Sequence, residues 1–265
     1  CLDQYSTDSY IVRFYTKMIS SSNPTSYPSK RIIHTLFILH LCIYKCVSMT
    51  VTTYNYFAFG SNMCSSTMTA LRSIEPIASS AAILPQHILR FNIPGVDAIE
   101  PSSASVEPCI SLYENASLTN VSQNVHGVLY KLTEEDFLKM CNTEGVPFAY
   151  SLHKVRVVPY IGDGEQKGLD ALREQCIFDD DNKMKLKKSI FAYTLRATRK
   201  EWRTGTDIPP SQAYLNVLIR GAKEFSLDRE YLEYLESIET GKTIGKGLAE
   251  MMLDVAIFRK RFDRP

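Results

Sequence analysis

The chain has 265 residues, of which 45% are apolar and 22% are charged, with 30 Lys and Arg against 29 Asp and Glu. This composition is that of a globular protein with a sizeable core, and it excludes disordered, collagen-like and repeat proteins. A formal net charge of +1 gives no overall attraction to phosphate, so we expect a small-molecule partner and no nucleic acid.

Seven cysteines lie at irregular spacings, without a C-x-x-C pair or a Cys/His quartet of zinc-site spacing. An odd number without a framework is typical of reduced thiols. We therefore expect no metal centre and a cytoplasmic location.

The first 53 residues differ from the rest of the chain. Ser, Pro and Thr gather at 20–29, and an apolar run over 32–47 follows two basic residues, as in a secretory signal or a membrane anchor. Polar residues interrupt this run of only 16 residues, whereas about 20 are needed to cross a bilayer. We expect residues 1–53 to be a poorly ordered or targeting extension and expect no membrane partner, while an anchor stays open as an alternative; Met49 is an alternative start.

From residue 54 onwards the pattern predicts regular strands and helices. Aromatic and β-branched runs predict strands over 54–59, 88–93, 125–130, 152–160 and 189–196. Caps and helical spacing predict helices over 63–71, 134–141, 211–222, 227–238 and 248–262. Because these elements mix without a strict βαβ alternation, we expect an α+β domain with a mixed or mostly antiparallel sheet.

Residues 161–188 interrupt this pattern with three aspartates at 179–181 and lysines after them. Adjacent carboxylates on a loop ordinarily stay solvated, so we expect an insertion and no metal site there. The expected organisation is a domain over 54–240, which contains the insertion at about 161–188, followed by a helical tail over 241–265.

Other short motifs lack their required context. Gly241-Lys242-Thr243 resembles the end of a phosphate-binding loop, but the first glycine of that motif would fall on Glu236. His87 and His126 fall in predicted strands without the partners of a catalytic triad. We expect both histidines to be structural.

Three features remain: the strand and turn YFAFGSNM at 56–63, the isolated acid Glu144, and a set of tyrosines. A glycine at a strand end lets ligand atoms approach the backbone, and successive N–H groups at a turn can hold a carboxylate or an oxyanion. The same residues are compatible with a strand-to-helix turn capped by Ser61 or Asn62 and with an ordinary surface glutamate.

The ordered set of motifs resembles the γ-glutamyl cyclotransferase-like family. YFAFGSNM is similar to the signature of that family, and further landmarks follow in the same order at 89–92, 125–130, 143–145, 192–195 and 209–214. The resemblance covers about 54–240. The stretch 95–107 further resembles a plant and fungal subgroup.

This resemblance implies a small, mixed β-barrel-like sheet flanked by helices, with the Gly-Ser-Asn loop and one glutamate facing a common pocket. Glu144 matches the catalytic acid/base. The substrate-binding positions implied by the resemblance are Phe59, Gly60, Ser61, Asn62, Met63, Cys64, Tyr150, Tyr193 and Tyr214. Phe59 stands where the family has tyrosine, so that hydroxyl is absent. No cofactor is implied.

The activity that the resemblance implies is release of 5-oxoproline from a γ-glutamyl amino acid, peptide or amine, as in glutathione metabolism. An alternative is a non-catalytic member of the fold that binds an acidic metabolite or a protein partner. A hydrolase with Ser61 as nucleophile is a third option, although no motif places a histidine beside it. The substrate and the oligomeric state stay open.

Overall fold

The structure is a computed structural model that describes residues 52–109, 124–162, 165–179 and 184–243. The expected N-terminal extension lies outside these residues except for 52–53. The expected tail lies outside except for 241–243, and the helix expected over 248–262 is therefore not described. Within the described residues, no helix is long and apolar enough to cross a membrane.

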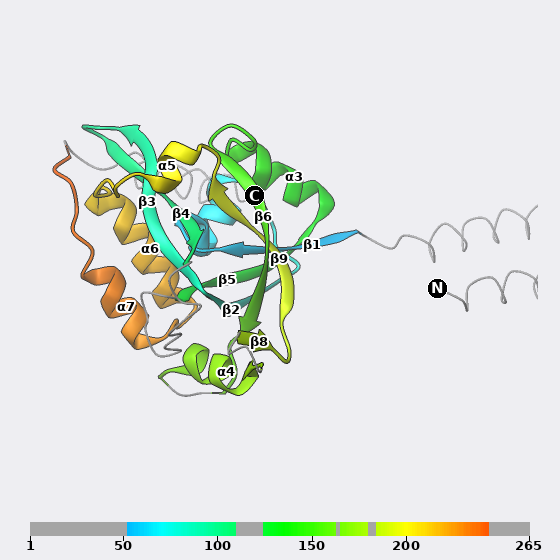
Figure 1. Cartoon of the computed structure of the whole chain (residues 1–265). Coiled ribbons are helices and arrows are strands. Elements are labelled where there is room, and N and C mark those ends of the chain that lie inside the picture. Colours follow the sequence, from blue (N-terminus) through cyan, green and yellow to red (C-terminus); the bar gives the residue numbers. More distant parts are fainter. Residues whose placement is uncertain (1–51, 110–123, 163–164, 180–183, 244–265) are drawn as a thin grey trace, which may run out of the picture. The chain divides into compact units, whose positions relative to one another are not determined.

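Five strands close into a barrel in which neighbours run β1, β5, β2, β6 and β9 (Figure 1). Their bounds are Thr53–Ala58 for β1, Ala78–Pro85 for β2, Asn124–Thr133 for β5, Tyr150–Pro159 for β6 and Ile190–Ala197 for β9. Neighbouring strands are antiparallel except β1 and β9, which are parallel with Tyr56 opposite Tyr193. The expected α+β class with a mixed barrel-like sheet is confirmed.

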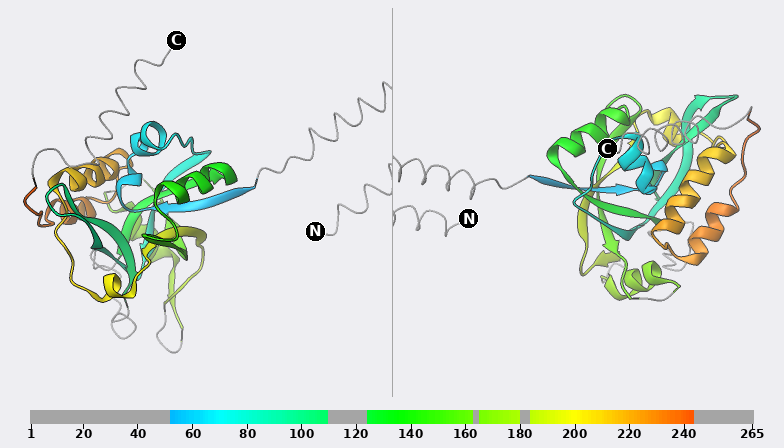
Figure 2. Two further views of the ribbon diagram at one scale, coloured as in Figure 1. Left: turned by 90° about the horizontal axis from the view of Figure 1, so that it is seen from above. Right: turned by 180° about the vertical axis from the view of Figure 1, so that it is seen from behind.

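Two hairpins and a set of helices complete the described fold. The hairpins pair β3 (His87–Val96) with β4 (Glu100–Pro108), and β7 (Cys176–Phe178) with β8 (Met184–Leu186). The helical elements are η1 (Ser61–Met63), η2 (Thr67–Leu71), α3 (Glu134–Thr143), α4 (Lys167–Gln175), α5 (Lys200–Thr204), α6 (Gln212–Glu224) and α7 (Arg229–Glu236). Figure 2 shows α6 and α7 side by side on one face of the barrel, and α6 also packs on η1.

The two main helix starts follow from their cap residues. The Thr133 hydroxyl accepts a hydrogen bond from the amide of Asp136 at 3.1 Å, as the Thr-Glu-Glu-Asp pattern predicts. The Ser211 hydroxyl accepts one from the amide of Tyr214 at 2.9 Å. These caps fix where α3 and α6 begin, and both helices carry residues of the candidate site.

The charges of the segment 161–188 predicted a solvated insertion, but part of this segment is buried. It contains α4, and Leu169, Ala171 and Leu172 of that helix are buried against Ile83 and Val158. A short apolar face at helical spacing was not recognised in the sequence, because charged residues dominate the composition of the segment.

Gly221 allows α6 to lie directly on the loop that follows β1. A Cβ atom at this position would lie 2.6 Å from the backbone nitrogen of Cys64 and 2.7 Å from the carbonyl carbon of Met63. Backbone atoms cannot move aside as a flexible side chain does. The small residue therefore sets the distance between α6 and the loop.

We predict that Gly221→Ala destabilises the fold by about 1–3 kcal/mol, because overpacking at backbone contacts costs that much. Thermal denaturation followed by circular dichroism measures the effect. Asn216→Ala, an exposed change on the same helix, is the control and should stay within about 0.5 kcal/mol of wild type. An equal stability of Gly221→Ala and the control would contradict this packing.

His126 of β5 is part of a buried polar group that joins three elements. Its Nδ1 is hydrogen-bonded to the Tyr160 hydroxyl, and its ring stacks on Tyr231 at 4.5 Å between centroids. The Tyr160 hydroxyl also accepts a hydrogen bond from the amide of Asp228 at 3.2 Å. The Asp228 carboxylate accepts two backbone N–H bonds at the start of α4, each 2.9 Å long. His126 thus has the structural environment that we expected.

Burial lowers the pKa of His126 to about 3 from an ordinary value of 6.5. On acidification the unfolded chain therefore takes up a proton that the folded chain excludes, so this contribution to stability is complete above pH 6.5 and is lost as the pH falls. We predict that the melting temperature of the wild type falls between pH 7 and pH 4, and falls less steeply in His126→Gln. Circular dichroism melts across this range measure both slopes, and equal slopes would contradict the prediction.

Candidate active site

The loop after β1 forms one tight turn. The amide of Met63 donates to the Gly60 carbonyl at 2.9 Å, and the amide of Cys64 donates to the Ser61 carbonyl at 3.2 Å. Among the described residues, the amides of Ser61 and Asn62 have no hydrogen-bond partner. That successive N–H groups of this turn bind a ligand stays a prediction.

Most side chains of this loop are buried, and Ser61 is partly exposed. The side chains of Phe59, Met63 and Cys64 are buried. The Asn62 side chain is also buried, but its polar atoms are all engaged with other members of the candidate site. Asn62 is therefore the loop residue whose side chain forms hydrogen bonds within the candidate site.

Glu144 lies at the C-terminal end of α3, where its amide donates to the Met140 carbonyl at 3.0 Å. Gly145 follows with φ +70, a left-handed conformation that ends the helix and turns the chain towards β6. The Glu144 side chain is 12% exposed, so it is not an ordinary surface glutamate.

The structure brings Asn62 and Glu144 into direct contact. Asn62 Nδ2 donates one hydrogen bond to Glu144 Oε1 at 2.8 Å and another to the Tyr56 hydroxyl at 2.9 Å. Asn62 Oδ1 accepts from Arg72 Nε at 2.7 Å, and Arg72 Nη2 forms an ion pair with Glu144 Oε1. Each polar group of the amide thus has a partner of the right type, which fixes its orientation.

Tyr56 supports this network from β1. Burial first, and then the negative charge of Glu144, raise the pKa of Tyr56 far above its ordinary value. The phenol is therefore neutral, and it accepts the hydrogen bond from Asn62.

Tyr150 and Tyr214 meet at the backbone of Ala104 in β4. The Tyr150 hydroxyl donates to the Ala104 carbonyl at 2.8 Å, while the Tyr214 hydroxyl accepts from the Ala104 amide at 3.2 Å. Burial is the main cause that raises the pKa of both tyrosines, and the charge of Glu144 adds to it. A Cβ atom on Gly60 would lie 3.1 Å from the Tyr214 hydroxyl, so this tyrosine borders the loop.

Tyr193 lies in a different aromatic group. Its ring is 6.3 Å from Tyr54 and 5.4 Å from Phe137 between centroids. Among the described residues, no hydrogen bond or ring contact joins it to Glu144 or to Tyr214. The structure therefore does not bring Tyr193 together with the other tyrosines singled out in the sequence.

Sequence reasoning missed Tyr56 and Arg72. Tyr56 stands inside the quoted motif, but its position in a strand suggested only packing. Arg72 follows the expected helix over 63–71 and has the pattern of a surface residue. Its 12% exposed side chain is evident only once the loop and α3 are placed together.

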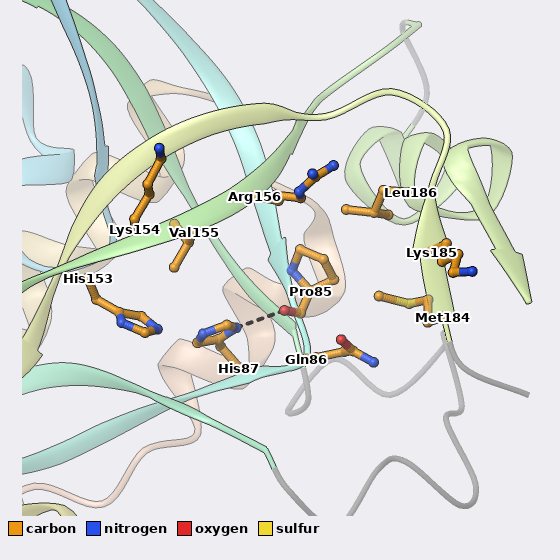
Figure 3. A pocket seen from close by; sticks show the side chains of 10 residues that line it. All are labelled: Pro85, Gln86, His87, His153, Lys154, Val155, Arg156, Met184, Lys185 and Leu186. Carbon is orange, nitrogen blue, oxygen red and sulfur yellow. Dashed lines mark hydrogen bonds between the residues drawn. The ribbon is translucent and has the colours of Figure 1, made fainter. Parts of the chain in front are cut away.

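A separate cavity of about 560 Å³ lies between β6, the β2–β3 turn and the β7–β8 hairpin (Figure 3). Its lining includes His87, His153 and Arg156 but none of the predicted site residues. The Arg156 guanidinium lies 4.4 Å from the centroid of the Phe191 ring and is thus already engaged outside the cavity. Among the described residues, no group of three metal-binding side chains occurs there or elsewhere.

Comparison with known proteins gives a consistent picture. Residues 124–235 match the model of the AIG2-like family. The chain is 29% identical over 190 residues to Gamma-glutamyl cyclotransferase gliK of Aspergillus fumigatus, covering 69% of this chain and 61% of that protein. It is 26% identical over 160 residues to Gamma-glutamyl cyclotransferase gliK of Claviceps purpurea, covering 60% and 59%. The chain thus spans about three fifths of the length of these curated relatives.

A solved structure named Gamma-glutamyl cyclotransferase has the same fold, with a TM-score of 0.52 and 21% sequence identity over 78% of this chain and 99% of that chain. The resemblance read from the motifs is therefore supported by sequence relatives and by fold. The chain is thus similar to proteins named γ-glutamyl cyclotransferase in sequence, and it shares the fold of one of them.

Proposed function

We propose that this protein releases 5-oxoproline from a γ-glutamyl compound, with Glu144 as the general acid/base. The observation that carries the proposal is the 2.8 Å hydrogen bond from Asn62 Nδ2 to Glu144 Oε1. It joins the Gly-Ser-Asn loop to the acid across 82 positions of sequence. The names of the two fungal relatives support this reaction class.

The reaction is an intramolecular acyl transfer. The α-amine attacks the side-chain carbonyl carbon of the same γ-glutamyl residue, a new C–N bond closes a five-membered lactam, and the C–N bond to the leaving amine breaks. Because nucleophile and electrophile are tethered, holding the substrate folded recovers part of the several kcal/mol that orientation can supply.

A single carboxylate can carry the protons of this reaction. The α-amine is an ammonium ion near neutral pH, so it loses one proton to solvent before it attacks and a second proton as the lactam C–N bond forms, while the leaving nitrogen must gain one. Glu144 would take the proton lost on C–N bond formation and deliver it to the leaving nitrogen, which makes it both base and acid. Its Oε1 is held by Asn62 and Arg72, while Oε2 has no partner among the described residues. We assign the proton transfers to Oε2.

The loop would bind the substrate through its backbone. The free amides of Ser61 and Asn62 suit the α-carboxylate or the oxyanion of the tetrahedral intermediate. Since the side chains of Phe59, Met63 and Cys64 are buried, their part in binding would be to shape the loop. Tyr214 would close the site beside Gly60, and Tyr150 would hold Tyr214 and β4 in place through Ala104. No contact supports the same role for Tyr193.

We predict that Glu144→Gln keeps the fold but lowers kcat for 5-oxoproline release at least 100-fold, since general acid–base catalysis typically contributes about 10²–10⁴-fold. Glutamine has nearly the same shape but cannot carry the proton. Chromatographic detection of 5-oxoproline, with a panel of γ-glutamyl amino acids, glutathione and γ-glutamyl amines, measures the activity. Glu135→Gln, an exposed acid on the same helix, is the control and should match wild type.

Retained turnover in Glu144→Gln would refute the assigned role. Binding of γ-glutamyl compounds by the wild type without any 5-oxoproline would instead favour a binding module of the same fold. Loss of activity in Ser61→Ala together with an acyl-enzyme intermediate would favour the hydrolase.

We also predict that Gly60→Val raises KM strongly. A Cβ atom here already lies 3.1 Å from the Tyr214 hydroxyl, so two further methyl groups would occupy the space between the loop and that tyrosine. Calorimetric titration of a non-cleavable γ-glutamyl analogue measures the affinity, and a melting curve verifies the fold. Unchanged affinity in a folded variant would show that the loop is only a turn.

A further inference from the structure

We propose that Arg72 is a positioning residue of this site, which holds Glu144 Oε1 so that Oε2 is presented to the substrate. This inference rests on the proposed function. It adds a residue that neither the motif nor the tyrosine set contains, and it names the oxygen of Glu144 that transfers the proton.

The contacts of Arg72 form a closed triangle with two other side chains. Arg72 Nε donates to Asn62 Oδ1 at 2.7 Å, Arg72 Nη2 pairs with Glu144 Oε1, and Asn62 Nδ2 donates to the same Oε1 at 2.8 Å. The side chains of Arg72 and Glu144 are each 12% exposed. Charge-assisted bonds at this degree of burial are stronger and better defined than surface ion pairs.

Both donors converge on one carboxylate oxygen. Among the described residues, no second cation forms an ion pair with Glu144, and no hydrogen bond is formed to its Oε2. A carboxylate that is anchored at one oxygen can rotate little, so the free oxygen has a fixed direction. One oxygen of the carboxylate is thus anchored, and the other is left to exchange protons with the two substrate nitrogens in a fixed geometry.

The backbone around Arg72 is tied to the helix that carries Glu144. Met68 and Ile74, on either side of Arg72, are fully buried, and the amide of Ile74 donates to the Met68 carbonyl at 2.9 Å. Ser73 has φ +53, which is uncommon for a residue other than glycine. Its carbonyl accepts a hydrogen bond from Lys139 Nζ of α3 at 3.0 Å. The segment and α3 are therefore linked at two points, one of which is the ion pair.

A planar guanidinium is suited to this position, whereas an ammonium group is not. Arg72 uses two different nitrogens for two acceptors, and their fixed separation sets the spacing between Asn62 and Glu144. Lysine would supply the charge at a single point and could satisfy only part of the triangle. The spacing, and not the charge alone, is the proposed contribution.

The experiment measures kcat and KM for 5-oxoproline release in Arg72→Ala and Arg72→Lys. We expect kcat to fall about 100-fold in Arg72→Ala, as for a misplacement of about 1 Å, with KM within a few-fold of wild type. Arg72→Lys should recover little of this loss. Free guanidinium at low, non-denaturing concentration should restore part of the activity of Arg72→Ala. Arg173→Ala, which removes an exposed arginine from α4, is the matched control and should match wild type.

The outcomes separate this inference from the proposed function. A wild type that forms no 5-oxoproline from any compound of the panel overturns both. An active wild type with unchanged kcat in Arg72→Ala overturns the positioning role alone, as does a loss that falls entirely on KM. If Arg72→Ala shows no cooperative melting transition, Arg72→Lys carries the test, and wild-type kcat in that variant overturns the proposal.

Discussion

The candidate site depends on one side-chain amide that is shared among three partners. Asn62 donates to Glu144 and to Tyr56 and accepts from Arg72, so a residue of the first turn, a strand tyrosine and a helix-end glutamate are held together. None of these contacts requires a bound ligand. The Glu144 carboxylate is therefore held in place by groups of the protein itself, which is the arrangement that would favour the proposed catalysis by orientation.

The surrounding fold explains why this amide can make its contacts. Gly221 lets α6 approach the loop within backbone contact distance, and the same helix presents Tyr214 to the Ala104 backbone. From the other side, the left-handed Gly145 ends α3 at Glu144. The barrel supplies the base, since Tyr56 is part of β1, which pairs with β5 and β9 (Figure 1).

Much of this fold could be predicted from local patterns, and the rest could not. The Thr133 and Ser211 caps and the strand before Gly60 follow from short-range chemistry. β2 and β4 were missed because runs of Ala, Ser and Pro lack the β-branched residues on which strand prediction depends. β4 pairs with its neighbour β3 in a hairpin, whereas β2 pairs with β5 and β6, which are distant in sequence and are therefore tertiary context that a local pattern does not contain.

The candidate site shows the same division. Glu144 and the Gly-Ser-Asn loop were singled out through the resemblance, because each alone has an ordinary pattern. The ring contacts of Tyr193 with Phe137 and Tyr54, and the burial of Arg72, depend on how distant elements pack. A charged residue after a helical stretch predicts an exposed side chain, and the burial of Arg72 is explained by its ion pair with Glu144 together with its hydrogen bond to Asn62.

A crystal structure of the protein with a non-cleavable γ-glutamyl analogue would show directly whether Glu144 faces the substrate. If Glu144 carries the proton, the α-amine of the analogue lies within hydrogen-bond distance of Glu144 Oε2, about 2.6–3.2 Å, with Oε1 still bound by Asn62 and Arg72. An analogue bound elsewhere, for example in the cavity beside His87 and His153 (Figure 3), or one that turns its α-amine away from Glu144, would contradict it.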